Sequence, residues 1–373
     1  MSDPRILVVH DYLIQRGGAE RVVDAMLEIY PDATLATSVI SPEYRRHHDG
    51  REIVTSYLQK MPGSQAAFRA LLPLYPSAFS RMKLPESDLV LISSSGFAHH
   101  VARNAEAPVL VYCHTPPRFL WRAGDYFGDR RTAKTISEPL LAHLRKLDLA
   151  AAAEPAQYLS NSRTTEGRIA TVYQRQAPVV YPPVSVERFQ WAAERDDFYL
   201  VVSRLLDYKR IDLAVEACAR LGRRLVVIGD GPGAGRLKEL AGTTVELPGE
   251  LPDEEVTALM QTCRAFIFPG EEDFGISPVE AMAAGAPVIA FNRAGATETV
   301  IDGETGVLFE EQTVEAVCAA IEQIERREWS AHRSRERAEE FRPERFAEGL
   351  RRHVDDVLAG RAPGLPAHVE DSA

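Results

Sequence analysis

The segment Gly270–Gly285 holds the side chains best suited to chemistry, because it combines carboxylates with the start of a helix. Glu272 lies in the loop that precedes the predicted helix Pro278–Ala284, and Glu280 lies on its first turn. Ser277 is the expected N-cap, so backbone N–H groups that suit phosphate or sugar oxygens follow it. Ser277 and Glu280 also form a capping-box pattern, which gives Glu280 alone a structural explanation. The whole segment predicts a site whose two carboxylates hold the hydroxyls of one ligand.

Two cations, Arg204 and Lys209, form a second candidate group. They lie between the predicted strand Tyr199–Ser203 and the predicted helix Arg210–Leu221. Fixed cations near a helix start suit a diphosphate, and they stabilise the charge that builds up when a diphosphate leaves. A solvated basic face is the structural alternative, and for the pair alone it is the better explanation.

Glycines follow two predicted strands at places where the backbone could approach a ligand closely. Gly17 and Gly18 lie between the first predicted strand and a helix, and Gly231 follows the predicted strand Arg224–Ile228. Glycine permits close approach to phosphate or sugar, but tight turns use the same residue. By themselves these glycines therefore indicate a turn as strongly as a binding site.

His114 ends the predicted buried strand Val109–His114 and precedes an aromatic and basic stretch, Arg118–Trp121. Ligands of open α/β sheets bind beyond the carboxyl ends of the strands. A lone histidine is more often structural, but a histidine at this place is a better catalytic candidate. We expect it to point into the crevice between two domains.

The elements that position these residues alternate between strand-like and helix-like runs, which predicts an α/β fold with two doubly wound, Rossmann-like domains. The linker is predicted at Val180–Pro183, where two prolines end the first series. Residues 1–183 and 184–345 are the two predicted domains, 346–360 belong to a closing helix, Pro343–Leu358, and 361–373 form a disordered tail. The predicted strands are Arg5–His10, Leu89–Ser93, Val109–His114, Tyr158–Asn161, Tyr199–Ser203, Arg224–Ile228, Ala265–Phe268, Pro287–Ala290 and Gly306–Leu308.

Composition narrows the class of protein. The 373 residues suffice for two domains, and no apolar run is long enough for a secretory signal or a membrane span, which predicts a cytoplasmic protein. The net charge of −11 argues against a nucleic-acid partner, although residues 1–185 are slightly basic. The four cysteines have no spacing typical of a metal or redox site.

One segment, Tyr57–Leu84, mixes apolar and basic side chains and predicts short amphipathic pieces. Its cations would meet anionic headgroups while its apolar side chains enter the membrane interface. The alternative is a helical pair packed on the first sheet with its charges in water. The cations are Lys60, Arg69, Arg81 and Lys83, and the apolar side chains include Phe68, Leu71, Leu72, Tyr75, Phe79 and Met82.

Together these stretches make the sequence resemble the family 4 retaining glycosyltransferases of the GT-B fold over nearly its whole length. The resemblance implies two Rossmann-like domains facing a central cleft, with the last helix crossing back to the first domain. Glu272 and Glu280 match the family's E-x7-E pattern, in which the first glutamate binds the donor hexose and the second binds the nucleotide ribose. The Ser-Arg…Lys-Arg pattern implies that Arg204 and Lys209 contact the pyrophosphate.

The remaining site residues follow from the same resemblance. It implies that His114 lies near the transferred sugar and that Gly17 and Gly18 contact donor or acceptor. The other residues it assigns to donor binding are Gly231, Phe274, Gly275, Ile276 and Ser277. Gly295-Ala296-Thr297-Glu298 departs from the family's usual Gly-Gly or Gly-Pro before a glutamate, which leaves that loop without an assigned role.

The sequences around His114 and Glu272 are similar to those of bacterial mannosyltransferases of O-antigen and exopolysaccharide assembly. That similarity favours GDP-mannose as donor and a glycan or polyprenyl-diphosphate-linked acceptor. The sequence has no Asp-x-Asp, which is consistent with a transfer that needs no metal ion, and no other cofactor is expected.

Three other functions remain open. An NAD-dependent dehydrogenase would need a G-x-G-x-x-G turn, but Ala234 stands where the third glycine after Gly229 and Gly231 belongs. A GT-B epimerase acting on a nucleotide-sugar shares the fold and is the closer rival. A non-catalytic sugar-nucleotide-binding protein would have little use for the full set of carboxylates, cations and histidine.

Overall fold

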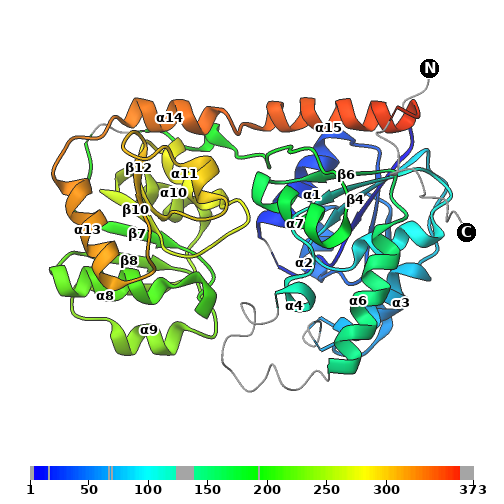
Figure 1. Cartoon of the computed structure of the whole chain (residues 1–373), viewed down its shortest axis with the longest axis horizontal. Coiled ribbons are helices and arrows are strands. Elements are labelled where there is room, and N and C mark those ends of the chain that lie inside the picture. The colour runs from blue at the N-terminus through cyan, green and yellow to red at the C-terminus, as the bar shows by residue number, and fades with distance from the viewer. Residues whose placement is uncertain are drawn as a thin grey trace, which may run out of the picture. The chain divides into compact units, whose positions relative to one another are not determined.

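The computed structural model describes residues 4–15, 17–65, 68, 70–122, 138–191 and 194–361. The chain divides into two compact units (Figure 1). The first unit is Met1–Pro183 with Phe346–Ala373, and the second is Val184–Arg345. Apart from Arg361, the predicted tail 361–373 lies outside the described residues.

The first unit is built on a six-stranded parallel sheet in the order β3-β2-β1-β4-β5-β6. Successive side chains of a strand point to opposite faces, so Leu7 and Val9 pack in one core and Ile6 and Val8 in the other. Both faces of the sheet are therefore covered. The strands are β1 (Ile6–His10), β2 (Thr34–Thr37), β3 (Ile53–Thr55), β4 (Leu89–Ser94), β5 (Val109–Cys113) and β6 (Gln157–Ser160).

Helices cover the two faces of this sheet. One face packs against α1 (Gly18–Ile29) and α15 (Pro343–Leu358), and Figure 1 shows these two helices on the same side of the unit. The other face packs against the remaining larger helices. The further helices and 3₁₀ turns are α2 (Pro42–His47), α3 (Tyr75–Ser80), α4 (Arg118–Trp121), α6 (Glu138–Ala152), α7 (Arg163–Tyr173), η1 (Tyr57–Lys60), η2 (Leu72–Leu74) and η3 (Ala98–Asn104).

The helix α15 belongs to the core of the first unit from Phe346 onward. Its buried side chains Phe346, Leu350, Val354 and Val357 recur every three or four residues, which places them on one face of the helix. The Phe346 ring lies 5.6 Å from the ring of Tyr112 on β5, edge to face. The sequence-predicted closing helix is thus confirmed, and it packs on the first unit.

The second unit repeats the same topology. Its strand order is β12-β11-β10-β7-β8-β9. When β7 is counted as the first strand and the order is given from the opposite edge, it is 3-2-1-4-5-6, as in the first sheet. The strands are β7 (Tyr199–Val202), β8 (Leu225–Ile228), β9 (Val245–Gly249), β10 (Ala265–Phe268), β11 (Val288–Phe291) and β12 (Gly306–Phe309). The helices and turns are η5 (Val186–Arg188), η6 (Asp207–Lys209), α8 (Ile211–Leu221), α9 (Ala234–Leu240), α10 (Asp253–Thr262), α11 (Ile276–Ala283), α12 (Ala296–Thr299), α13 (Val314–Glu325) and α14 (Ala331–Glu339).

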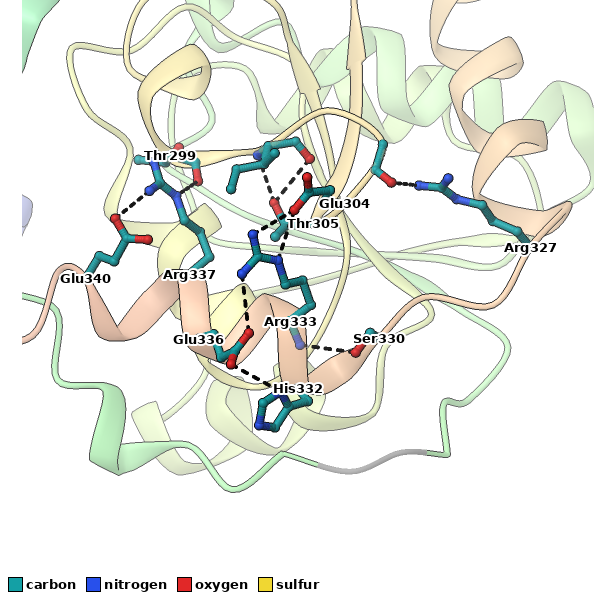
Figure 2. A network of polar contacts seen from close by, with 12 residues as sticks. Thr299, Glu304, Thr305, Arg327, Ser330, His332, Arg333, Glu336, Arg337 and Glu340 are labelled. Carbon is teal, nitrogen blue, oxygen red and sulfur yellow. Dashed lines mark hydrogen bonds and ion pairs between the residues drawn. The ribbon is translucent and has the colours of Figure 1, made fainter.

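Polar contacts anchor α14 to the loops around α12 and β12 (Figure 2). The guanidinium of Arg337 donates to the carbonyls of Glu298 and Thr299, at the carboxyl end of α12. Arg333, one turn earlier, donates to the carboxylate of Glu304 at 2.8 and 2.9 Å. Arg337 and Arg333 thus tie α14 to the end of α12 and to the loop before β12.

The predicted α/β fold with two Rossmann-like sheets is confirmed, while three strands were missed. These are β2, β3 and β9. The strands β3 and β9 lie at sheet edges. β3 is half-buried, and in β9 exposed residues alternate with buried or half-buried ones, so neither forms a continuous apolar run. No helix among the described residues is long and apolar enough to cross a bilayer.

The segment Tyr57–Leu84 packs differently from the amphipathic interpretation. Tyr75, Phe79 and Met82 are buried in the core of the first unit, so these side chains are unavailable to a membrane. This part of the prediction was wrong, because the turns of the segment fold its apolar residues inward. The exposed apolar side chains here are Tyr57, Met61 and Leu74, the exposed cations are Lys60, Arg81 and Lys83, and Arg69 lies outside the described residues.

Candidate functional site

The second unit places its candidate residues where its strand order reverses. The neighbouring strands β7 and β10 are parallel. From β7 the chain continues to β8 and β9 toward one edge of the sheet, and from β10 it continues to β11 and β12 toward the other edge. Ligands of doubly wound sheets bind beyond the carboxyl ends of such strands. Arg204 follows the end of β7, and Glu272 follows the end of β10. This location agrees with the site predicted from the sequence.

Lys209 and Glu272 form an ion pair between the loops that follow β7 and β10. Each of the two side chains is only 15% exposed. Gly270 allows this approach, because a Cβ atom there would lie 2.8 Å from the Cα and carbonyl oxygen of Lys209. The carbonyl of Glu272 accepts a hydrogen bond from the Gly295 N–H at 2.9 Å. The loop that carries Glu272 is thus fixed by Lys209 through its side chain and by Gly295 through its main chain.

Glu280 lies on α11 and is 8% exposed. Its Oε1 is 3.9 Å from Nη1 of Arg188, which comes from η5. The Arg188 guanidinium also lies 3.7 Å from Oδ2 of Asp253. Sequence reasoning did not single out Arg188, whose only signal is a cation shortly after the linker prolines. The candidate site therefore combines two carboxylate–cation pairs, Lys209–Glu272 in the loop before α11 and Arg188–Glu280 on the helix.

The start of α11 differs from the predicted one. The helix begins at Ile276, two residues before Pro278, and its N-cap is Gly275 instead of Ser277. Gly275 has φ +84°, a conformation that glycine adopts without strain, and a Cβ atom there would lie 2.9 Å from the ring of Phe268. The predicted cap was wrong because the left-handed glycine ends the loop earlier. Ser277 is now within the first turn, where helix N–H groups lack partners inside the helix.

Two other residues assigned to donor binding have packing roles. The Phe274 ring is 3% exposed and lies 5.4 Å from the ring of Phe341, so a donor contact from Phe274 would involve its main chain. Gly231 has φ +156°, and a Cβ atom there would lie 2.6 Å from the carbonyl oxygen of Leu205. Close packing against the loop that holds Arg204 therefore accounts for this glycine without any ligand. Arg204 itself is exposed.

In the first unit, His114 lies directly after β5, beside the point where the order of that sheet reverses between β1 and β4. Its Nε2 is 2.8 Å from Oγ of Ser93, and the same hydroxyl is 3.1 Å from Nδ1 of His10. Burial, and then the charge on His10, lower the pKa of His114 to about 3. The imidazole is therefore neutral at neutral pH and offers one donor and one acceptor.

The Gly17-Gly18 turn starts α1, with Gly17 as the N-cap. A Cβ atom on Gly17 would lie 2.8 Å from Oε2 of Glu20, which is 4% exposed. A carboxylate in the first turn interacts favourably with the helix dipole. The glycine thus makes room for this buried carboxylate, and whether Gly17 or Gly18 contacts a ligand stays a prediction.

Asp11, which the sequence analysis missed, fixes the loop after β4. Its carboxylate accepts hydrogen bonds from the N–H groups of Ser95 at 2.6 Å and Ala98 at 2.7 Å. Its place directly after β1 was the signal that could have found it. Asp11 therefore holds the loop after β4 against the end of β1.

Comparisons with known proteins agree with this picture. Residues 185–341 match the family described as glycosyl transferases group 1. A GDP-mannose-dependent alpha-(1-6)-phosphatidylinositol monomannoside mannosyltransferase of Mycolicibacterium smegmatis is 30% identical over 192 residues, 43% of this chain and 50% of that protein. A putative colanic acid biosynthesis glycosyltransferase, WcaL of Salmonella typhimurium, is 30% identical over 142 residues, 34% of this chain and 35% of that protein. The chain thus spans half or less of the length of these relatives.

Among solved structures, Anabaena HepE in complex with UDP superposes with a TM-score of 0.71 at 17% identity, covering 94% of this chain and all of that one. At such identity the likeness concerns the fold. The structural match covers both sheets, whereas the family match covers the second unit. The chain therefore has the GT-B fold, it resembles bacterial mannosyltransferases, and its residues 185–341 match the glycosyl transferases group 1.

Proposed function

We propose that this protein is a retaining, metal-independent glycosyltransferase that moves a hexose from a nucleotide-sugar to an acceptor hydroxyl. The observation that carries the proposal is the Lys209–Glu272 ion pair, placed at the carboxyl end of β10 before the helix that holds Glu280. Carboxylates suit the hydroxyls of a hexose and a ribose, and cations suit the diphosphate between them. The site thus offers partners for each part of a nucleotide-sugar.

In the proposed glycosyl transfer, the protein contributes by binding the substrates and by stabilising charge. The bond between the hexose C1 and the diphosphate oxygen breaks, and a bond from C1 to the acceptor oxygen forms on the same face. The acceptor proton passes to the leaving diphosphate. Lys209, Arg204 and the N–H groups at the start of α11 stabilise the charge that develops on that diphosphate, in place of a divalent ion. His114, as a neutral imidazole, would hydrogen-bond the transferred sugar.

For the donor we propose GDP-mannose, and for the acceptor a glycan or a polyprenyl-diphosphate-linked glycan of cell-surface polysaccharide synthesis. The names of two relatives support this choice, one as GDP-mannose-dependent and one as a colanic acid biosynthesis enzyme. The UDP complex of HepE makes UDP-sugars the alternative donors. The exposed cations Lys60, Arg81 and Lys83 support peripheral contact with an anionic membrane on the cytoplasmic side.

A panel of GDP- and UDP-sugars tests the proposal. Ligand at 100 times its Kd stabilises the folded state by about 2.7 kcal/mol, so the true donor raises the melting temperature clearly. With that donor we expect slow release of nucleoside diphosphate without acceptor, and an unchanged anomeric configuration in the product by NMR. Inversion at C1 would exclude the retaining mechanism. An altered nucleotide-sugar instead of a transferred one would identify an epimerase, and binding without turnover on any acceptor would favour a non-catalytic sugar-nucleotide-binding protein.

A further inference from the structure

The guanidinium of Arg335 is held among main-chain carbonyls in the second unit. This residue lies on α14, and its side chain is 18% exposed. Its Nη1 donates to the carbonyls of Val186 at 2.7 Å, Phe189 at 2.9 Å and Ala283 at 3.1 Å. Its Nε donates to Oε1 of Glu339, one turn further along the helix, at 2.7 Å. One side chain thus joins α14 to two other segments of the chain, Val186–Phe189 and the end of α11.

The three carbonyls belong to the segments that carry Arg188 and Glu280. Val186 and Phe189 flank Arg188 in and after η5, and Ala283 is the last residue of α11, which carries Glu280. The Arg188–Glu280 contact of 3.9 Å therefore joins two segments that Arg335 binds at the same time. Moving the Arg335 guanidinium would release both sides of this pair.

A second guanidinium supports the same helix end. Nη2 of Arg195 donates to the carbonyl of Ala284 at 2.7 Å, and its Nη1 donates to the carbonyl of Gln261 at 2.9 Å. A Cβ atom on Gly285 would lie 2.6 Å from that Nη2, so glycine leaves room for it. Two cations at the carboxyl end of α11 also interact favourably with the helix dipole. Two guanidinium groups therefore hold the carboxyl end of α11.

We propose that Arg335 is a positioning residue for nucleotide binding: it fixes the Arg188 segment and the Glu280 helix relative to each other. This inference rests on the proposed function, because it assumes that Glu280 holds the nucleotide of the donor. Arg335 would act on the donor through these two segments and not by direct contact. A displacement of about 1 Å at a binding group can cost 10²-fold, so a residue outside the site can have a large effect.

Isothermal titration with GDP and with UDP tests this on the full chain. We expect Arg335→Met to weaken binding of whichever nucleotide the wild type prefers by about tenfold or more, and to raise the donor KM more than it lowers kcat. Arg335→Lys keeps the charge but loses the planar fork that reaches several carbonyls, so we expect an intermediate loss. Arg333→Met is the matched control, because it removes a cation from the same helix whose guanidinium, among the residues that the structure describes, bonds to Glu304 and Glu336 and not to the segments of Arg188 or Glu280.

A double-mutant cycle separates positioning from general destabilisation. If Arg335 acts through Glu280, the variant Glu280→Gln with Arg335→Met binds no more weakly than the worse single variant. Fully multiplicative losses, or binding by Arg335→Met within twofold of the wild type, would overturn the inference. Circular dichroism at the titration temperature verifies folding, and if Arg335→Met does not fold, Arg335→Lys takes its place in the cycle. If the wild type binds neither nucleotide, the proposed function fails as well.

Discussion

Lys209 and Glu272 come from two different loops and meet as an ion pair with both side chains largely shielded from water. Each side chain therefore fixes the position of the other before a ligand binds. A carboxylate held by a lysine presents its remaining lone pairs in a defined direction, which suits recognition of sugar hydroxyls. The same contact ties the loop after β7 to the loop after β10, so one part of the site cannot shift without the other.

This pairing predicts non-additive losses of activity. Glu272→Gln and Lys209→Met should each lower kcat/KM by roughly 10²–10³, because each removes a group aimed at charge or hydroxyls in the transition state. The double variant should lose little more than the worse single one, since the two groups act as a unit. Steady-state kinetics with the preferred donor measure these values. The variant Lys238→Met, at an exposed position of α9, is the control and should keep wild-type activity. Near-normal turnover in either site variant would remove the site assignment.

Chelation gives a second prediction. Transfer should persist in excess EDTA, because Lys209, Arg204 and the first turn of α11 supply the positive potential that a divalent ion would otherwise supply. Initial rates with and without EDTA, on enzyme already dialysed against chelator, measure this. A rate that vanishes with EDTA and returns with magnesium or manganese would refute metal independence.

Stability should fall in acid through two buried histidines. Burial is the main cause that lowers the pKa of His114 to about 3 and that of His100 to about 4, against about 6.5 in an unfolded chain. Protonation therefore favours the unfolded state. The contribution of each histidine is complete above pH 6.5 and is lost as the pH falls toward its folded pKa, at about 1.4 kcal/mol per pH unit.

Urea unfolding at several pH values between 7.5 and 4.5 measures this slope. The variant His114→Gln should reduce the slope below pH 6.5 toward a limit of about 1.4 kcal/mol per pH unit less than the wild type, because one protonation is removed. Carboxylates that also titrate in this range contribute equally to both proteins and cancel in the difference. Parallel curves for the two proteins would show that His114 titrates normally.

A further prediction concerns the membrane. Each cation near an anionic surface contributes about 1 kcal/mol, so Lys60, Arg81 and Lys83 together can hold the protein reversibly on such a surface. Co-sedimentation with anionic vesicles should show binding that decreases as salt rises and that disappears when all three become serine. Because Tyr75, Phe79 and Met82 are buried, these three side chains should not contribute to vesicle binding.

The control for that experiment removes the same charge elsewhere. Arg45, Arg46 and Lys146 are exposed in other parts of the first unit, and their replacement by serine should leave vesicle binding unchanged. Equal loss in both triple variants would indicate a nonspecific effect of net charge. If the wild type ignores anionic vesicles at low salt, a soluble acceptor becomes the better proposal.

The sequence predicted the central strands and the loops after them, because buried parallel strands are continuous apolar runs and their carboxyl ends carry the polar residues. It failed at two sheet edges, β3 and β9, where half-buried or exposed residues interrupt the apolar run, and it also missed β2, which lies between β3 and β1. The segment Tyr57–Leu84 shows the same limit, since a run that mixes apolar and basic residues does not reveal which side chains fold inward. Tertiary packing decides that question.

Within the site, the sequence predicted Glu272, Glu280 and Lys209 as candidates but not the contact that joins Lys209 to Glu272. Arg188 and Arg335 were missed because their roles depend on segments that are distant in sequence and meet only in the folded chain. The cap of α11 was misplaced for a local reason. A left-handed glycine competes with serine for the helix start, and the close ring of Phe268 favours the glycine.

The path of α15 has a consequence for protein synthesis. The ribosome makes residues 1–183 first, yet the core of that unit also contains Phe346, Leu350, Val354 and Val357. Burial of each such side chain contributes about 1.5–3 kcal/mol, so the unit made first lacks a substantial part of its stability until residue 358 has emerged. The unit made second, Val184–Arg345, is one continuous stretch and needs no later residues for its core. The order of completion during translation is therefore the reverse of the order along the chain.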